Sequence, residues 1–514
     1  MLTTKFINRF EGGGNPYLLI NIIFSFFPIS FVLGSLFVNI NLILFCCLGI
    51  FYLKSKIFEF KLDLSIKFIF LFFLVILFST ALSFFKSLYF EGFEYVHMER
   101  LVKSILLFRF LLMLIIIYLL VEYSILDFRY FIFSTIFISI LVSLDIIFQY
   151  IFGFNTMGLQ SIGIHNSGFF HDELIAGGFI QRFSFFSILS TIFLLKNIKK
   201  NQYIFTIISI CILGTGILLS GNRMPLMLFL LGLILIFLFN FSLKKIIFLS
   251  FVGLFIIFKF LITSDDSIKN FYLSYYGNAK DLIIIVTPNI IKENLRKYNT
   301  SGNLEESKVE GIPSYQSLQK RIFLTSIDTW KKNKLFGNGI KSFRLDCQKL
   351  ATQPPKISEE QQEKIDELIS SGDEEKFEEA QKLIVKNITN QIKNSEGQEV
   401  NMMETFIPFK KNRLCSNHPH NYYLEILTEV GAVGFLIALV IALLFSIFIL
   451  KNFKLLKKDN LQNFILLAAI ISLIIELFPF RTSGSFFSTN NATYITLIVS
   501  IYLSNKKILK DKNF

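Results

Sequence analysis

Long apolar stretches recur along this chain and limit its fold more than any other feature. A transmembrane helix needs about 20 apolar residues to cross the hydrocarbon core of a bilayer, and shorter stretches suffice where the membrane thins. The sequence therefore predicts an all-α integral membrane protein with about 12 transmembrane helices. The stretches lie at 17–36, 39–53, 68–85, 104–121, 131–151, 174–195, 203–220, 224–241, 246–263, 431–450, 461–479 and 491–504.

The composition excludes several other classes of protein. Apolar residues of the AVILMFWYC set make up 53% of the chain, and charged residues make up only 17%. Soluble proteins carry about 25% charged residues because these cover their surface. We therefore exclude a soluble enzyme, a disordered protein and a disulfide-rich secreted scaffold.

The positive charge is concentrated on one predicted side of the membrane. With a cytoplasmic N-terminus and twelve spans, the segments predicted inside contain 20 Lys and Arg against 7 Asp and Glu. This excess of 13 equals the net charge of the whole chain, +13. Lys and Arg accumulate in short cytoplasmic loops. The pattern predicts that both termini are cytoplasmic, and it leaves no charge argument for nucleic-acid binding.

The predicted organisation has three parts. Residues 1–263 hold transmembrane helices 1–9, residues 264–430 form a large outer loop, and residues 431–514 hold helices 10–12 and a cytoplasmic tail. Within the loop, 358–394 is predicted as a charged helical insertion without chemistry of its own. Cys347 and Cys415 flank this insertion on the oxidising side, so we expect a disulfide bond between them.

The segment 415–434, CSNHPHNYYLEILTEVGAVG, contains the sharpest candidate for chemistry. His420 precedes Asn421, a favourable N-cap for a helix that runs into the tenth span. A histidine at this place suits a general base acting on a sugar hydroxyl. The alternatives are an interfacial histidine at a helix cap, or a metal site with His418, for which two ligands are too few.

Three further segments contain candidate arginines: one in a turn between two spans, one in the large outer loop and one inside a span. Arg223 lies in the short turn LSGNRMPL, where it either snorkels to the headgroups or binds a diphosphate. Arg321 begins a predicted surface helix that ends before Gly337-Asn338-Gly339. Arg182 lies inside the sixth span, where arginine is costly and is often functional. His171 and Asp172 lead into that span as a possible site or as a simple helix start.

Together these segments resemble the superfamily of O-antigen ligases and O-antigen polymerases of bacterial envelopes. SGNRMPL is similar to its Ser-Arg turn, and Arg321 to Phe343 is similar to its Arg, Trp and Gly-x-Gly block. NHPHNYYLEILTEVGAVGFL resembles its His-Asn block, and FPFRTSGSFFSTNNATY resembles its closing outer loop. Two departures stand out: the turn has Asn222-Arg223-Met224 rather than Ser-Arg-Gly, and 358–394 is additional.

The resemblance implies a membrane enzyme that transfers a glycan from undecaprenyl diphosphate to an acceptor hydroxyl, without a metal, nucleotide sugar or other cofactor. It implies the bacterial inner (plasma) membrane and a periplasmic active face. By position, His420 would be the catalytic base, while Arg223 and Arg321 would bind the diphosphate. Further residues are possible substrate contacts: His418, Arg182, His171, Asp172 and Arg481.

The sequence leaves the reaction partly open. A ligase would use lipid A core or a similar acceptor, whereas a polymerase would use a second lipid-linked glycan, and we favour the ligase. A polyprenol-linked glycan transporter is the alternative from another class. Transporters usually place ionisable residues near the bilayer midplane. The predicted spans hold few of these, mainly Arg109, Asp145, Arg182 and Glu476, whereas the candidate site residues cluster outside them. A membrane scaffold is the third reading.

Overall fold

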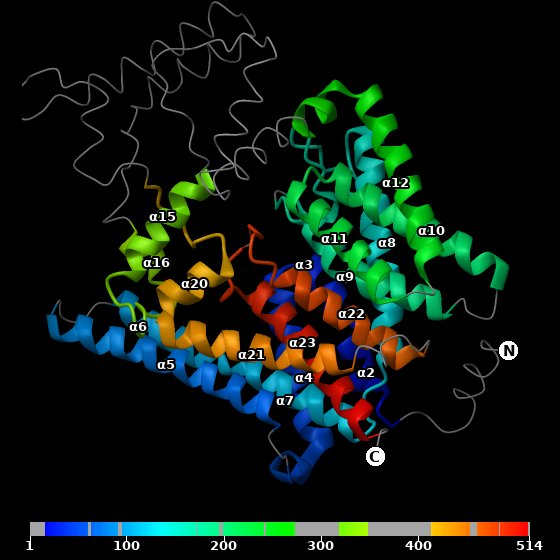
Figure 1. Cartoon of the computed structure of the whole chain (residues 1–514). Helices are drawn as coiled ribbons and strands as arrows, with labels where there is room; N and C mark the ends of the chain where they lie inside the picture. Colours follow the sequence, from blue (N-terminus) through cyan, green and yellow to red (C-terminus); the bar gives the residue numbers. More distant parts are fainter. Residues whose placement is uncertain are drawn as a thin grey trace, which may run out of the picture. The chain divides into compact units, whose positions relative to one another are not determined.

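The fold is built from helices throughout the described part of the chain (Figure 1). The computed structural model describes residues 16–59, 63–90, 95–171, 173–194, 199–240, 243–272, 318–347, 413–452, 460–482 and 484–511. Within these ranges there is no β-strand, and the two isolated bridges lie between Phe154 and Gln160 and between Ile162 and His165. The charged insertion 358–394 lies outside the described residues.

Helices overlap each of the predicted apolar stretches. In chain order they are α2 (Leu18–Ser25), α3 (Phe27–Leu33), α4 (Ser35–Leu53), η1 (Lys54–Glu59), α5 (Leu64–Phe90), α6 (Tyr95–Leu106), α7 (Phe108–Glu122), α8 (Phe128–Phe152), η2 (Gly168–Phe170), α9 (Ala176–Leu194), α10 (Lys199–Leu219), α11 (Arg223–Phe239), α12 (Lys244–Ser264), α15 (Leu318–Trp330), α16 (Phe343–Asp346), α20 (Tyr422–Glu429), α21 (Gly431–Lys451), α22 (Leu461–Glu476) and α23 (Thr489–Asp511).

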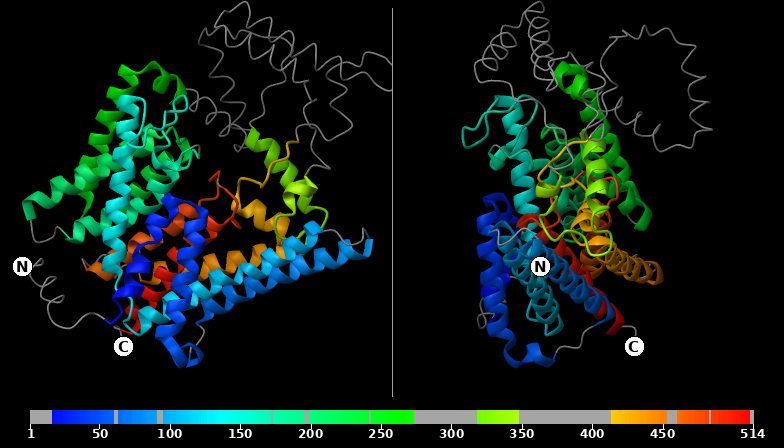
Figure 2. Two further views of the ribbon diagram at one scale, coloured as in Figure 1. Left: turned by 180° about the vertical axis from the view of Figure 1, so that it is seen from behind. Right: turned by 90° about the vertical axis from the view of Figure 1, so that its left-hand side faces the viewer.

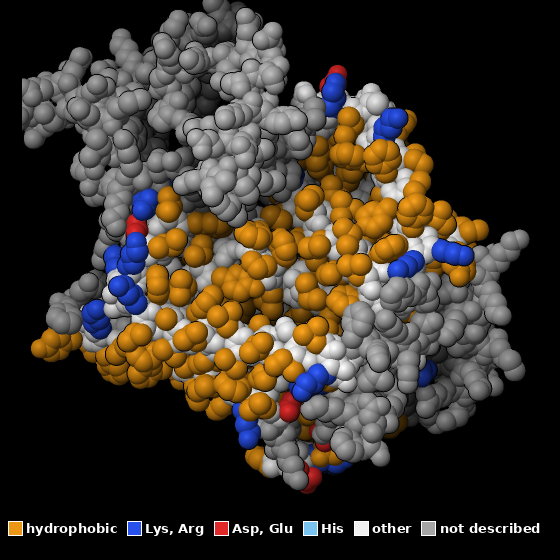
Figure 3. Space-filling model, in the orientation of Figure 1, with side chains coloured by type: hydrophobic (Ala, Val, Ile, Leu, Met, Phe, Trp, Pro, Cys, Tyr) orange, Lys and Arg blue, Asp and Glu red, His pale blue; other side chains and the backbone are white. Residues whose placement is uncertain are grey.

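The chain is an all-α membrane protein. Six of its helical segments are long and apolar enough to cross a bilayer, and three shorter apolar helices accompany them among the described residues. Many large apolar side chains on these helices are exposed, such as Phe51 on α4 and Phe255 on α12. Hydrophobic side chains cover much of the face seen in Figure 3. A surface of this kind is stable against lipid but not against water.

The first apolar stretch differs from the prediction of one continuous span. It is divided into α2 and α3 at Phe26, and Pro28 stands in the first turn of α3. Proline fits the first turn of a helix because its missing N–H would have no partner there. Gly34 then adopts φ +101° and separates α3 from α4. Twelve membrane crossings remain a prediction.

The helices belong to two compact units. The first comprises Met1–Leu74, Lys103–Lys308 and Leu436–Phe514. In it α8, α9 and α10 pack against one another, α22 packs on α9, and α23 packs on α7 and α22 (Figure 2). Its core is rich in phenylalanine: Phe183 and Phe186 are buried, and Phe131 lies edge-on to Phe186.

The second unit comprises Val75–Val102 and Val309–Phe435. It therefore combines the described ends of the predicted outer loop with the end of α5 and the start of α6. Within it, α15 packs against α20, and α16 contacts both helices. The apolar pattern assigns residues 75–102 to the end of the third predicted span and the short connection that follows it.

Candidate functional site

Asn421 caps α20 and thereby fixes the residue before it. Its side-chain oxygen accepts hydrogen bonds from the backbone N–H groups of Tyr423 and Leu424, at 3.0 and 3.2 Å. The predicted N-cap is therefore confirmed. His420 immediately precedes this cap and has φ +55°, a left-handed conformation that is uncommon for residues other than glycine. Backbone strain of this kind costs about 1–3 kcal/mol and persists only where neighbouring contacts hold it.

Two side chains of the same segment contact the His420 imidazole. The hydroxyl of Ser416 lies 3.0 Å from Nε2 of His420. The ring of His418 lies alongside, with its centroid 4.1 Å from that of His420. Both histidines are partly exposed, so this small cluster is accessible rather than enclosed in the core.

A disulfide bond anchors the start of this segment. Cys347 and Cys415 form a disulfide bond, with Cα atoms 5.2 Å apart. Cys347 is fully buried beside Ile322 of α15 and Phe343 of α16. The disulfide thus attaches the residue before Ser416 to a small hydrophobic core.

Helix α15 holds the same segment from its other side. The carboxylate of Asp328, which is almost fully buried, accepts hydrogen bonds from two nitrogens of Arg413, each at 2.7 Å. Arg321 donates from one Nη to the backbone oxygen of Arg413 at 3.1 Å. The predicted helix is confirmed at Leu318–Trp330. Arg321 is partly buried and packs against the segment that leads to the histidines.

The Gly-Asn-Gly block at 337–339 and the Glu-Val-Gly block at 429–431 are hydrogen-bonded to each other through the backbone. Asn338 and Gly339 donate their N–H groups to the carbonyls of Thr428 and Glu429, at 3.0 and 2.9 Å. Gly337 and Gly431 have φ +70° and +78°. A Cβ atom on either residue would collide with backbone atoms in or next to the other block. The two blocks are therefore a docking motif, which no sequence spacing revealed.

This docking also corrects the predicted helix after Asn421. The helix does not run unbroken into the tenth span: α20 ends at Glu429 and α21 begins at Gly431. The left-handed Gly431 and the close approach of the Leu335 carbonyl cause the break.

Arg100, which the sequence left without a role, supports the docked blocks. It is buried, and its guanidinium donates to the carbonyls of Ile340, at 2.9 Å, and of Asn338. The hydroxyl of Ser79 on α5 lies within hydrogen-bond distance of the carbonyls of both Phe336 and Glu429, which share its single hydrogen. Arginine between two predicted spans was the only available signal, and it pointed equally well to the headgroups.

Two acidic side chains are buried on α20, four residues apart. Glu425 and Glu429 are each 1% exposed. Burial raises the pKa of the Glu429 carboxyl well above its usual range, and the neighbouring Glu425 raises it further. The backbone N–H of Lys341 and the charge of Arg100 oppose this shift. The folded protein therefore binds the Glu429 proton more tightly than the unfolded chain does.

In the first unit, Arg223 begins α11 behind a tight turn. Its guanidinium carbon lies 3.6 Å from the centroid of the Phe271 ring, a cation–π contact. His165 lies edge-on to Phe271, with centroids 5.8 Å apart, and its Nδ1 is 3.4 Å from the Ser220 carbonyl. Gly177 of α9 touches Ser220 so closely that it has no room for a Cβ. The turn thus lies at the N-terminal end of α9.

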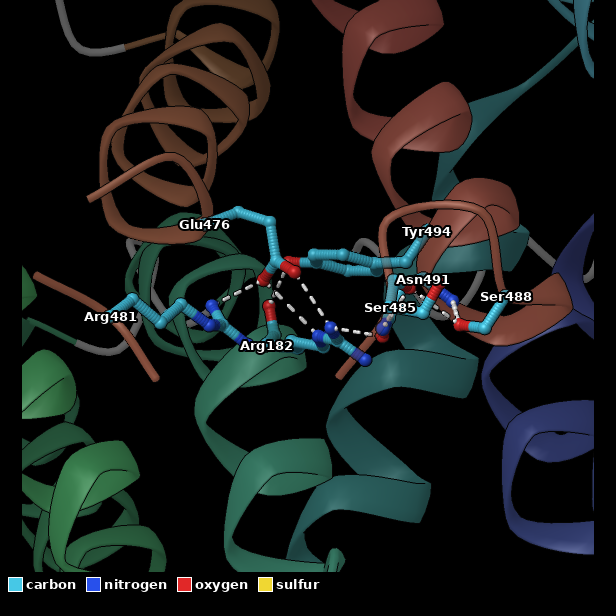
Figure 4. A network of polar contacts seen from close by, with 7 residues as sticks. All are labelled: Arg182, Glu476, Arg481, Ser485, Ser488, Asn491 and Tyr494. Atoms are coloured by element: carbon cyan, nitrogen blue, oxygen red, sulfur yellow. Dashed lines mark hydrogen bonds and ion pairs between the residues drawn. The ribbon is translucent and has the colours of Figure 1, made fainter. Parts of the chain in front are cut away.

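Arg182, also on α9, is part of a buried polar network (Figure 4). Glu476, at the end of α22, accepts from Nε and an Nη of Arg182 at 3.1 and 2.6 Å, and from Arg481 at 2.6 Å. Asn491 of α23 accepts from Arg182 at 2.6 Å, and Tyr494 donates its hydroxyl to the Arg182 carbonyl at 2.7 Å.

The structure thus groups the candidate residues within each unit. In the second unit it brings His418 and His420 together, with Arg321 on the helix that holds their segment. In the first unit it joins Arg182 to Arg481 through Glu476. His171 is exposed with φ +52°, and Asp172 lies outside the described residues. Arg223 stands at the same end of α9 as Arg182, in a separate set of contacts.

No protein-family model matches the chain, and no curated protein matches it either.

Proposed function

We propose that this membrane protein is a glycosyltransferase that moves a glycan from undecaprenyl diphosphate to an acceptor hydroxyl. The observation that carries the proposal is the setting of His420: it is partly exposed and held in a left-handed conformation beside the Asn421 cap. Its ring contacts the Ser416 hydroxyl and the His418 ring. General bases need access to a substrate together with a restrained ring, and this setting provides both.

In the proposed reaction, His420 takes the proton of the acceptor hydroxyl. The acceptor oxygen bonds to the anomeric carbon as the bond from that carbon to the diphosphate breaks. Undecaprenyl diphosphate leaves with the bonding electrons. Its charge needs fixed cations rather than an acid, and we assign this role to Arg223 and Arg321, whose guanidinium groups suit phosphate oxygens.

The proposed site faces the periplasm of the bacterial inner membrane, and the preferred acceptor is lipid A core or a similar molecule. Lipid-linked glycan as the acceptor would instead make the protein a polymerase. A single displacement would invert the anomeric configuration.

The test uses the purified protein with an undecaprenyl-diphosphate oligosaccharide, first alone and then with lipid A core, and identifies products by mass spectrometry. Glycosylated lipid A core indicates the ligase, and longer lipid-linked chains indicate the polymerase. We expect His420→Ala to lower the transfer rate about 10²–10⁴-fold, the usual contribution of a general base. Unchanged transfer by a normally abundant His420→Ala protein contradicts the proposed base.

The proposed diphosphate contacts are tested by Arg→Lys substitutions, which keep the positive charge but lose the bidentate hydrogen bonds of a guanidinium group. Arg223→Lys and Arg321→Lys are expected to raise the KM for the donor. Arg129→Lys is the matched control, since its side chain is 48% exposed and pairs with Asp127 at 3.6 Å. Equal kinetics for all three variants would remove both arginines from the mechanism.

A transporter is the second candidate, favoured by the buried charges of Arg182 and Glu476 within the helix bundle. A transporter would move labelled lipid-linked glycan from one leaflet of a proteoliposome membrane to the other without forming a new glycosidic bond. Movement without bond formation in the wild-type protein would favour this reading over the transferase.

A further inference from the structure

The short chain between the disulfide and α20 determines how the His420 ring is held. Cys415 is fixed by its bond to Cys347, and Asn421 is fixed as the cap of α20. Five residues lie between these two anchors, and within them the Ser416 hydroxyl reaches Nε2 of His420 at 3.0 Å. Ser416 is adjacent to the disulfide, so its position is limited by the covalent anchor.

A neutral imidazole carries one N–H and one lone pair, and a serine hydroxyl is able either to donate or to accept. If Ser416 donated to Nε2, the lone pair would be engaged and Nδ1 would carry the hydrogen, which leaves no nitrogen ready to take a proton. If Ser416 accepts from Nε2–H, the lone pair lies on Nδ1. The partner of one ring nitrogen thus sets the chemistry of the other.

We infer that Ser416 is the positioning residue of His420: its hydroxyl accepts the Nε2–H and so places the proton-accepting lone pair on Nδ1. This inference rests on the proposed function, because the direction of the hydrogen bond is chosen so that one ring nitrogen is able to take a proton; the tautomer itself is measured independently of activity. After proton uptake both ring nitrogens carry hydrogen, and Ser416 continues to accept from Nε2 without any rearrangement. The disulfide, by fixing Cys415, keeps the hydroxyl in place.

The tautomer is measured directly by solid-state NMR of the protein labelled with [15N]histidine and reconstituted in bilayers. The chain has 5 histidines, and His420→Gln identifies the signals of His420. We expect a protonated Nε2 and an unprotonated Nδ1 in the wild type, mixed tautomers in Ser416→Ala, and the wild-type pattern in Ser416→Thr, which retains a hydroxyl. Ser326→Ala is the matched control, because that hydroxyl donates to the Ile322 carbonyl of its own helix at 2.8 Å.

The role of the disulfide is measured in the Cys347→Ser/Cys415→Ser double variant. We expect mixed His420 tautomers there, as in Ser416→Ala. A wild-type pattern would show that Ser416 is held without the disulfide. A proton on Nδ1 in the wild type, or an unchanged pattern in Ser416→Ala, would overturn the positioning role.

The transfer assay separates this inference from the proposed function. We expect Ser416→Ala to lower kcat about tenfold, a fraction of the general-base contribution, with an unchanged KM for the donor, and Ser416→Thr to restore it. A wild-type protein with the expected tautomer but no transfer activity would refute the proposed function and leave the positioning contact standing. Full activity of Ser416→Ala with mixed tautomers would refute the catalytic meaning of the contact.

Discussion

Arg182 donates two hydrogen bonds to the carboxylate of Glu476, so that α9 and α22 are joined by a charged contact inside an apolar bundle. Arg481 shares the same carboxylate. Glu476 is 1% exposed, and the side chains of Arg182 and Arg481 are 13% and 9% exposed. A single buried carboxylate therefore organises two guanidinium groups from separate parts of the chain.

Because Arg182 and Arg481 share the Glu476 carboxylate, substitutions at these positions are expected to differ in their effect on protein stability. Glu476→Gln removes the negative charge that both guanidinium groups contact and leaves these groups together, so it is expected to destabilise the protein by about 3–5 kcal/mol. Arg481→Gln leaves the Arg182–Glu476 pair intact and is expected to cost less. Thermal unfolding of both variants in detergent checks the order. A less stable Arg481→Gln protein would mean that the carboxylate is not the organising group.

The Asn421 cap predicts a smaller and more local effect. Asn421→Ala leaves the N–H groups of Tyr423 and Leu424 without their acceptor, and loss of such a cap costs about 1 kcal/mol. Asn421→Asp keeps an acceptor oxygen and is expected to stay close to the wild type. The measurement is the midpoint of chemical unfolding. Equal midpoints for the Asn421→Ala and Asn421→Asp variants would show that the cap does not stabilise α20.

The paired glycine blocks predict that neither Gly337 nor Gly431 tolerates a side chain. Alanine at either position meets both a left-handed φ and backbone atoms of the opposite block, which has little freedom to shift. We expect a loss of several kcal/mol and a lower yield of folded protein. Gly178→Ala is the matched control, because its nearest neighbour would be Pro225 Cγ at 4.0 Å. Normal thermal stability of Gly431→Ala would contradict the docking.

The sequence predicts the helices well because long apolar stretches have few other ways to satisfy their backbone in a membrane. The predictions for α15 and the Asn421 cap also hold, since both depend on local patterns. The break at Gly431 and the role of Arg100 were not predictable, because each arises from residues far apart in the chain. The partner of Arg182 was also hidden, since nothing in the spacing of an isolated arginine identifies Glu476 as its counter-ion.

Glu429 predicts a pH dependence of stability whose sign follows from its raised pKa. The folded state binds this proton more tightly than the unfolded chain, so the stabilisation is complete below the ordinary glutamate pKa of about 4.3 and is lost as pH rises toward the folded value. Glu429→Gln imitates the protonated form and has no charge to bury. The difference in unfolding free energy, Gln variant minus wild type, is therefore expected to grow over the range from the ordinary pKa of about 4.3 up to the raised, folded value, by about 1.4 kcal/mol for each unit by which the pKa is raised. Glu59→Gln, at the end of the short helix η1, is the control, because Glu59 is exposed. A difference that stays constant over this range would mean that Glu429 is charged in the folded protein, with Arg100 and the Lys341 N–H outweighing burial.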